Sequence, residues 1–242
     1  MRNIIFKKIN FLDIEEYEFD KIIKKNGLFV FPSGPGLSTI TRDKIYLKSL
    51  INSDYVFFDS GYFVLILKLF KNINVKKVSG YKFLKFFFHY IKKKNIKLLL
   101  INPSLNFSAS NQKFLYKLGI KKKNIINYIA PIYNKKKIKD FKIIKIIKSN
   151  KPDYIMINLG SNIQEPLGDF INKKTKKKFK ILCTGAAISF FTGDQAPIGK
   201  IIDKFYLGWI VRIIFNPSLY FKRYLSAFYL LIIVLKNKIK TK

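Results

Sequence analysis

The sequence of 242 residues has few reactive side chains: one cysteine, one histidine and one tryptophan. A disulfide within the chain needs two cysteines, and a Cys/His zinc centre needs several such ligands, so neither can support this fold. Glycine-rich phosphate loops of the GxxxxGK[ST] and GxGxxG types are also missing. We therefore expect no metal and no cofactor, and we expect Cys183 to be a small buried hydrophobic side chain.

Acidic residues are scarce as well: there are 14, against 47 lysines and arginines, for a net charge of +33. Residues 60–139 contain no Asp or Glu. The abundant Lys, Ile, Asn, Phe and Tyr are residues that AT-rich codons supply, but codon bias does not explain the shortage of acids. The charge favours an anionic partner: a nucleic acid, an anionic lipid or a phosphorylated substrate.

Long apolar runs are absent too. The longest uncharged run near the C-terminus, Tyr224–Leu235, is too short to cross a bilayer, which needs roughly 20 apolar residues. The first residues, MRNIIFKKINFLDIEEYEF, lack the apolar core and cleavage site of a signal peptide. We expect a cytoplasmic protein.

A recurring unit organises the chain: a short β-type run, a loop, and a lysine-rich helical pattern. The runs are Phe29–Phe31, Tyr55–Phe58, Lys97–Ile101, Tyr154–Asn158 and Lys180–Thr184, and the helical patterns are Arg42–Ile51, Tyr62–Lys71, Tyr81–Lys94, Ser108–Leu118, Ile138–Ser149 and Gln164–Lys174. Alternating strands and helices predict an α/β fold, a Rossmann-like and mostly parallel sheet with helices on both faces, over residues 1–198. Residues 199–242 are apolar, basic and aromatic, and predict a helical appendage, broken at Asn216–Pro217, that associates with a membrane surface or docks on the core.

The loops after the expected strands are poor in lysine; residues 181–197, ILCTGAAISFFTGDQAP, contain none. In open α/β sheets, ligands bind outside the carboxyl ends of the strands. Each loop alone is an ordinary turn, but five together favour a ligand crevice.

Acidic residues at three places in the chain have both a structural and a functional interpretation. Asp59 follows YVFF directly, so it is either a general base at the crevice or the N-cap of the next helix; spacing alone favours the cap. Gln164 and Glu165 open the next helix. Either the acid stabilises the N-terminus of that helix, or both side chains bind a sugar or base. Glu18 and Asp20 have the spacing of a metal-diphosphate pair, but we expect them to be solvated. The single histidine, His89, is expected to pack on an aromatic helix.

Three stretches in this order, LGSNIQE, ILCTGAAISFFTGDQAP and LGWIVRIIFNPSLYFKRY, resemble the bacterial WecG/TagA/CpsF glycosyltransferases. Phe58–Gly61 stands where that family has A-D-G, and Lys77–Gly80 stands where it has a basic residue before V-x-G. The resemblance runs from Phe29 to Tyr224.

The resemblance implies an inverting, metal-independent enzyme that moves an N-acetylmannosamine-like or other hexose from a UDP-sugar to a polyprenyl-diphosphate-linked saccharide. Such an enzyme builds surface polysaccharide at the inner face of the cytoplasmic membrane. Asp59 would be the base, and Arg212 and Arg223 would stabilise the diphosphate leaving group. The expected substrate-binding residues are Ser60, Gly61, Lys77, Asn102, Gly160, Ser161, Gln164, Glu165, Thr184, Gly185 and Gln195.

Several positions depart from the family pattern. Asn162 replaces a proline, Ser189 an aspartate, Gln195 an arginine and Gly208 a glutamate. These changes indicate a sister subfamily with another sugar or acceptor. Two alternatives stay open: a basic Rossmann-like module that binds nucleic acid or nucleotide without catalysis, and a nucleotide-sugar binder that has lost activity. The expected crevice is poor in lysine and the aromatics lie in the tail, so we expect no nucleic-acid partner. A homo-oligomer is compatible with the sequence.

Overall fold

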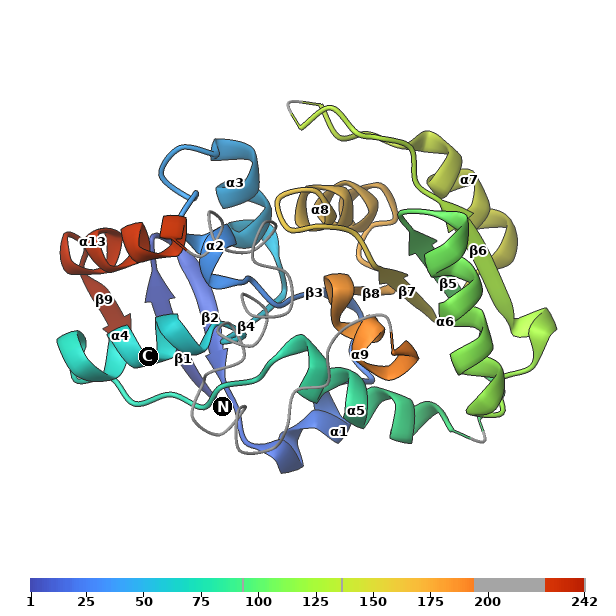
Figure 1. Cartoon of the computed structure of the whole chain (residues 1–242), viewed down its shortest axis with the longest axis horizontal. Coiled ribbons are helices and arrows are strands. Elements are labelled where there is room, and N and C mark those ends of the chain that lie inside the picture. The colour runs from blue at the N-terminus through green and yellow to red at the C-terminus, as the bar shows by residue number, and fades with distance from the viewer. Residues whose placement is uncertain (93, 136, 194–224, 242) are drawn as a thin grey trace.

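The computed structural model describes residues 1–92, 94–135, 137–193 and 225–241 (Figure 1). They form one sheet of nine strands in the order β6-β5-β7-β8-β3-β4-β2-β1-β9. The strands from β6 to β2 in this order are parallel, and β1 runs antiparallel to its neighbours β2 and β9. The bounds are β1 Arg2–Phe6, β2 Ile9–Asp13, β3 Gly27–Val30, β4 Tyr55–Phe57, β5 Leu98–Asn102, β6 Ile125–Ile129, β7 Tyr154–Ile157, β8 Lys180–Cys183 and β9 Ile239–Thr241.

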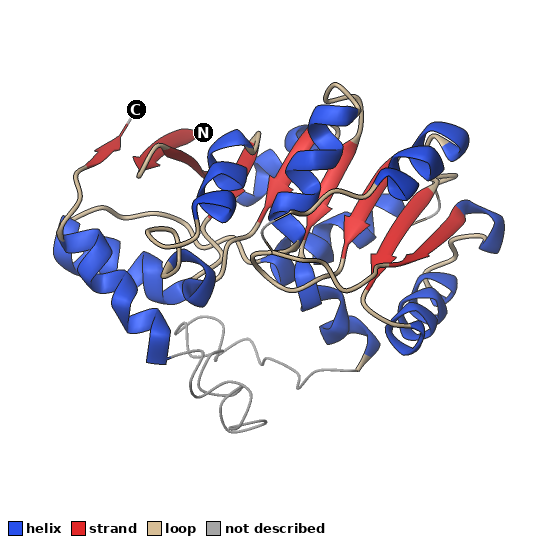
Figure 2. Ribbon diagram, turned by 90° about the horizontal axis from the view of Figure 1, so that it is seen from above, coloured by secondary structure: helices blue, strands red, loops and turns tan. Residues whose placement is uncertain are grey.

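Helices cover both faces of this sheet (Figure 2). One layer contains α2 (Gly34–Leu37), α3 (Lys44–Asn52), α4 (Gly61–Lys71), α7 (Phe141–Asn150), α8 (Gln164–Lys174) and α13 (Tyr229–Leu235). The other contains α1 (Phe19–Ile22), α5 (Gly80–Ile91), α6 (Leu105–Lys117) and the 3-10 turn η3 (Gly185–Ile188), which leads into α9 (Ser189–Thr192). Short 3-10 turns also lie at η1 (Glu16–Glu18), η2 (Lys122–Asn124) and η4 (Ser226–Phe228).

Strand side chains alternate between the two layers, as a sheet buried on both faces requires. Leu28 and Val30 of β3 join the core under α3 and α8, whereas Phe29 and Phe31 join the core under α5. The expected α/β fold, with its mostly parallel sheet and two helical layers, is therefore confirmed.

Of the expectations for single residues in this paragraph, one is confirmed and two are wrong. Cys183 is fully buried, as expected. Glu18 is buried rather than solvated, because its carboxylate accepts from the backbone N–H of Glu15. The pKa of Glu18 is lowered, chiefly by that hydrogen bond. His89 is exposed on α5 rather than packed, since the apolar stripe of that helix faces the sheet.

The described end of the chain, residues 225–241, packs on the main body: α13 lies against α2 and α4, and β9 pairs with β1. Residues 199–224, including the expected break at Asn216–Pro217, lie outside the described residues, so the boundary at 198/199 stays a prediction. Within the described ranges, no helix is long and apolar enough to cross a membrane.

Candidate active site

Two helix N-termini flank Asp59 at the carboxyl edge of the sheet. Ser60 caps α4 by accepting from Phe63 N (3.2 Å), and Ser79 caps α5 by accepting from Lys82 N (3.1 Å). The Oδ1 atom of Asp59 accepts from the first N–H of α5, that of Gly80, at 2.9 Å. The cap role that spacing favoured for Asp59 is thus wrong, because Ser60 caps α4. Helix N-termini favour negative charge, so the two helices stabilise the Asp59 carboxylate at this point.

Glycines let the loops after β3, β4 and β7 meet. A Cβ atom on Gly34 would lie 2.8 Å from Ser60 Oγ, and one on Gly36 would lie 2.6 Å from both Ser161 Oγ and the Tyr46 hydroxyl. Gly80 and the loop after β8 are also close, since an added Cβ would lie 3.5 Å from the Thr184 carbonyl oxygen. The structure therefore brings the loops after four neighbouring strands together.

Glu165 organises the loop after β7. Its Oε2 atom accepts from Asn162 N (2.9 Å) and its Oε1 atom accepts from the Gln164 side chain (3.1 Å), and the side chain is fully buried. Two other side-chain oxygens, Gln164 Oε1 and Thr184 Oγ1, are buried and have no hydrogen-bond partner among the described residues. Buried polar atoms normally have partners, so these two can accept or donate to a ligand.

Asn162 shows why one departure from the family pattern matters. Its φ of 68° is left-handed, and its backbone N–H is the donor to Glu165. Proline has no N–H and a φ fixed near −65°, so it can do neither. The Asn162 side chain also donates to Thr39 (2.8 Å) and Asp43 (3.0 Å). The loop after β7 is consequently tied to the β3 side of the crevice by the very residue that replaces proline.

Tyr46 of α3 belongs to this cluster and was not expected. It is fully buried, and its hydroxyl lies 3.5 Å from Ser161 Oγ. Burial, and then the nearby negative charges of Glu165 and Asp59, raise the pKa of Tyr46 well above its usual value. It therefore stays protonated and can donate. A tyrosine on an amphipathic helix carries no sequence signal that distinguishes it from a core residue.

Asn102 is separated from the other residues by β7. It is fully buried at the end of β5, where its Oδ1 atom accepts from the side chains of Asn111 and Asn158, both at 2.8 Å. Its Nδ2 atom is buried without a partner in the described part. Substrate contact by Asn102 stays a prediction.

The remaining expected residues divide into two groups. Gly61 opens α4, half-buried Lys77 lies between α4 and α5, and Gly160 and Gly185 lie in the loops after β7 and β8. Arg212, Arg223 and Gln195 lie outside the described residues, so their roles stay predictions. Across the described ranges, no group of three or more His, Cys, Asp or Glu is arranged to hold a metal ion.

In a comparison with protein families, the model of the glycosyl transferase WecG/TagA/CpsF family matches residues 3–242. Compared with curated proteins, the chain finds no match. The family works in cell-surface polysaccharide synthesis, in general with a nucleotide-sugar donor and a lipid-linked acceptor. Because the match spans nearly the whole chain, the protein belongs to the WecG/TagA/CpsF family and is a glycosyltransferase.

Proposed function

We propose that the protein is an inverting, metal-independent transferase that moves a hexose, N-acetylmannosamine-like or another, from a UDP-sugar to a polyprenyl-diphosphate-linked saccharide. The observation that carries this proposal is the Asp59 carboxylate, held by Gly80 N–H between the N-termini of α4 and α5. Family membership supplies the reaction class. A carboxylate held at the crevice supports the proposed role of Asp59 as the general base.

In the proposed reaction, Asp59 takes the proton of the acceptor hydroxyl while that oxygen attacks the anomeric carbon. The bond between this carbon and the UDP oxygen breaks, and UDP leaves with the electron pair. Inversion follows because the base and the leaving group lie on opposite sides of the sugar. Lys77, the expected basic contact for the substrate, is proposed to stabilise the charge that develops on the diphosphate. Arg212 and Arg223 are proposed to add to this stabilisation.

Exposed apolar side chains on two neighbouring helices support work at the inner membrane surface. Helices α4 and α13 run side by side and parallel: the rings of Tyr62 and Phe228 lie 5.6 Å apart near their starts, and Lys71 Nζ donates to Leu235 O (3.2 Å) at their ends. Their exposed apolar side chains are Leu65, Leu69, Phe70, Phe228, Tyr229, Ile232 and Leu235. Exposed apolar side chains beside lysines suit a surface of anionic lipid.

The deciding experiment compares wild-type protein with Asp59→Asn in a panel of UDP-sugars and synthetic polyprenyl-diphosphate-linked sugars, with EDTA present. We expect transfer that survives EDTA and falls at least about 100-fold in Asp59→Asn. Asp153→Asn is the matched control, because Asp153 also accepts a backbone N–H (Lys97, 2.8 Å) but lies at the opposite edge of the sheet.

Equal transfer by Asp59→Asn would remove Asp59 as the base and leave the enzyme standing. Failure of UDP to bind in calorimetry would instead reject the UDP-sugar donor. The membrane part is tested separately by sedimentation with anionic vesicles. Leu69→Glu should reduce binding, and Leu105→Glu, at an equally exposed site on α6, should not.

A further inference from the structure

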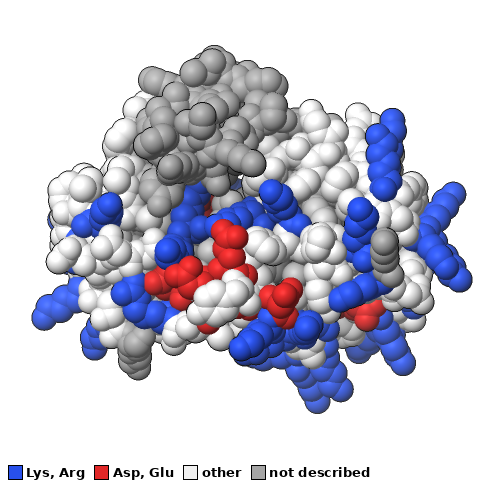
Figure 3. All heavy atoms as spheres, turned by 90° about the horizontal axis from the view of Figure 1, so that it is seen from below, with Lys and Arg blue, Asp and Glu red and all other residues white. Residues whose placement is uncertain are grey.

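The segment between α4 and α5, residues 72–79, contains two lysines and no acid, and its neutralising partners come from the start of the chain. Five of the 14 acids lie within residues 13–20: Asp13, Glu15, Glu16, Glu18 and Asp20. Figure 3 shows one face of the molecule on which acids gather in the middle and lysines and arginines lie around them.

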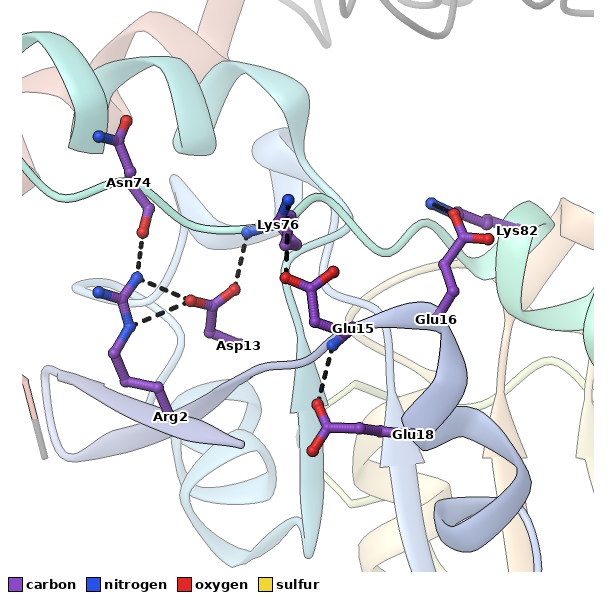
Figure 4. Close-up of polar contacts among 8 residues, drawn as sticks. All are labelled: Arg2, Asp13, Glu15, Glu16, Glu18, Asn74, Lys76 and Lys82. Carbon is purple, nitrogen blue, oxygen red and sulfur yellow. Dashed lines mark hydrogen bonds and ion pairs between the residues drawn. The ribbon is translucent and has the colours of Figure 1, made fainter.

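Figure 4 shows how this acidic stretch holds the segment. Asp13 Oδ1 accepts from Lys76 N at 2.7 Å, and Asp13 Oδ2 accepts from Arg2 at 2.7 Å. Arg2 in turn donates to the Asn74 carbonyl oxygen. Two further ion pairs, Lys76 with Glu15 (3.6 Å) and Lys82 with Glu16, lie outside this contact.

The anchors continue at every second residue towards the crevice. Val78 N donates to Phe58 O (2.9 Å), and Gly80 N donates to Asp59 (2.9 Å). The backbone groups of Asn74, Lys76, Val78 and Gly80 are thus fixed in turn, as along the edge of a strand. Lys77 lies between two fixed N–H groups, so its position is set by them.

Polar anchors act together with apolar packing at the far end of the segment. A hollow of about 660 Å³ lies beside Asn74–Lys76, and Asp13, Leu65 and Lys68 line its other walls. Ile73 and Val75 pack against the core, whereas Lys76 is exposed, so the hydrogen bond from Lys76 N to Asp13 holds the backbone at that residue.

We propose that Asp13 is a positioning residue for Asp59. It fixes Lys76 at one end of a five-residue span, and Gly80 at the other end presents its N–H to the Asp59 carboxylate. Asp13 touches no reacting group in this scheme and acts through the span. The catalytic half of this inference, an effect of Asp13 on kcat, rests on the proposed role of Asp59. The mechanical half, an effect of Asp13 on the backbone at Gly80, does not.

The mechanical half is tested by hydrogen exchange. Asp13→Ala should speed exchange of the Gly80 amide by about tenfold or more, although that amide does not contact Asp13. Asp153→Ala removes the same kind of bond, from carboxylate to backbone N–H, and should leave Gly80 unchanged. Faster exchange at Lys76 alone would overturn the proposal, since release would then not reach Asp59.

The catalytic half is tested by a double-mutant cycle with Asp59→Asn. Asp13→Ala should lower kcat about tenfold in the wild type, leave the KM for UDP-sugar within about twofold, and have almost no effect in the Asp59→Asn background. Asp13→Asn keeps an oxygen for Lys76 N and should recover most of kcat; it also serves if Asp13→Ala folds poorly. A full additional loss in the Asp59→Asn background would overturn the proposal. A wild type without transfer would reject the proposed function, and the exchange experiment would still decide the mechanical half.

Discussion

The two edges of the sheet use the same kind of contact, a carboxylate that accepts from a backbone N–H, for different purposes. At the amino edge, Asp54 accepts from Leu28 N (2.9 Å) and Asp153 accepts from Lys97 N, so each carboxylate joins neighbouring strands at their starts. At the carboxyl edge, Asp13 and Asp59 accept from Lys76 N and Gly80 N, in a segment outside the sheet. A carboxylate beside a strand therefore stabilises the fold at one edge and shapes the crevice at the other.

Asp54→Ala should give the largest effect on stability. The Asp54 carboxylate also accepts from Asn172 Nδ2 (2.8 Å) and pairs with Lys177 (2.5 Å), so the substitution leaves several donors without an acceptor. We expect the free energy of unfolding to fall by about 3 kcal/mol, measured by urea denaturation, with kcat per folded molecule unchanged. A lower kcat at unchanged stability would break the division between the edges.

Gly27→Ala should cost about 2 kcal/mol at the same edge. Gly27 has a φ of 133°, and a Cβ there would lie 2.9 Å from the Asp54 side chain. Thermal unfolding would measure the loss, and the KM for UDP-sugar should stay the same. A raised KM would show that strain at the amino edge reaches the crevice.

Gly36→Ala is the counterpart at the carboxyl edge. A Cβ there would lie 2.6 Å from Tyr46 and Ser161, so the loops after β3 and β7 must separate. We expect kcat/KM to fall about tenfold with a stability loss of about 2 kcal/mol, because the partly buried Ser161 can move but the fully buried Tyr46 must shift as well. Unchanged kinetics would remove this contact from the site.

The smallest effect concerns pH. The pKa of Glu18 is lowered in the folded state, first by the Glu15 N–H bond. A lowered carboxyl pKa gives stability that is present above the ordinary value of 4.5 and is lost as pH falls through the folded value. The free energy of unfolding should therefore fall less between about pH 6 and about pH 3 in Glu18→Gln than in wild type, as measured by urea denaturation at each pH. Identical curves would contradict this.

Sequence patterns predicted the parallel centre of the fold because its strands are apolar runs followed by loops. The β1–β2 hairpin was not expected, since its turn consists of Lys7 and Lys8, both with positive φ (50° and 67°). Such turns normally show Asn-Gly or Asp-Gly, so two lysines conceal the hairpin. Strand β9 was missed for another reason: its partner β1 lies at the opposite end of the chain.

The site was predictable in part. The loops after the strands located the crevice, because carboxyl ends of parallel strands share one edge. The partner of Asp59 was not predictable, since Gly80 is 21 residues away and reaches it only through the path of residues 72–79. Tyr46 escaped notice because its contact comes from another element. Asn162 was noted as a replacement for proline, but its contacts with Thr39 and Asp43 were not predictable.

The pairing of β9 with β1 has a practical consequence for deletion experiments. Removing residues 199–242 as one piece would strip β1 of its outer neighbour and would remove Leu230, Ile233 and Val234 from the core. An open strand edge invites self-association, so the shortened protein could pellet without any lipid present. A deletion that probes membrane binding should therefore keep residues 225–241 and join them to the body by a flexible linker.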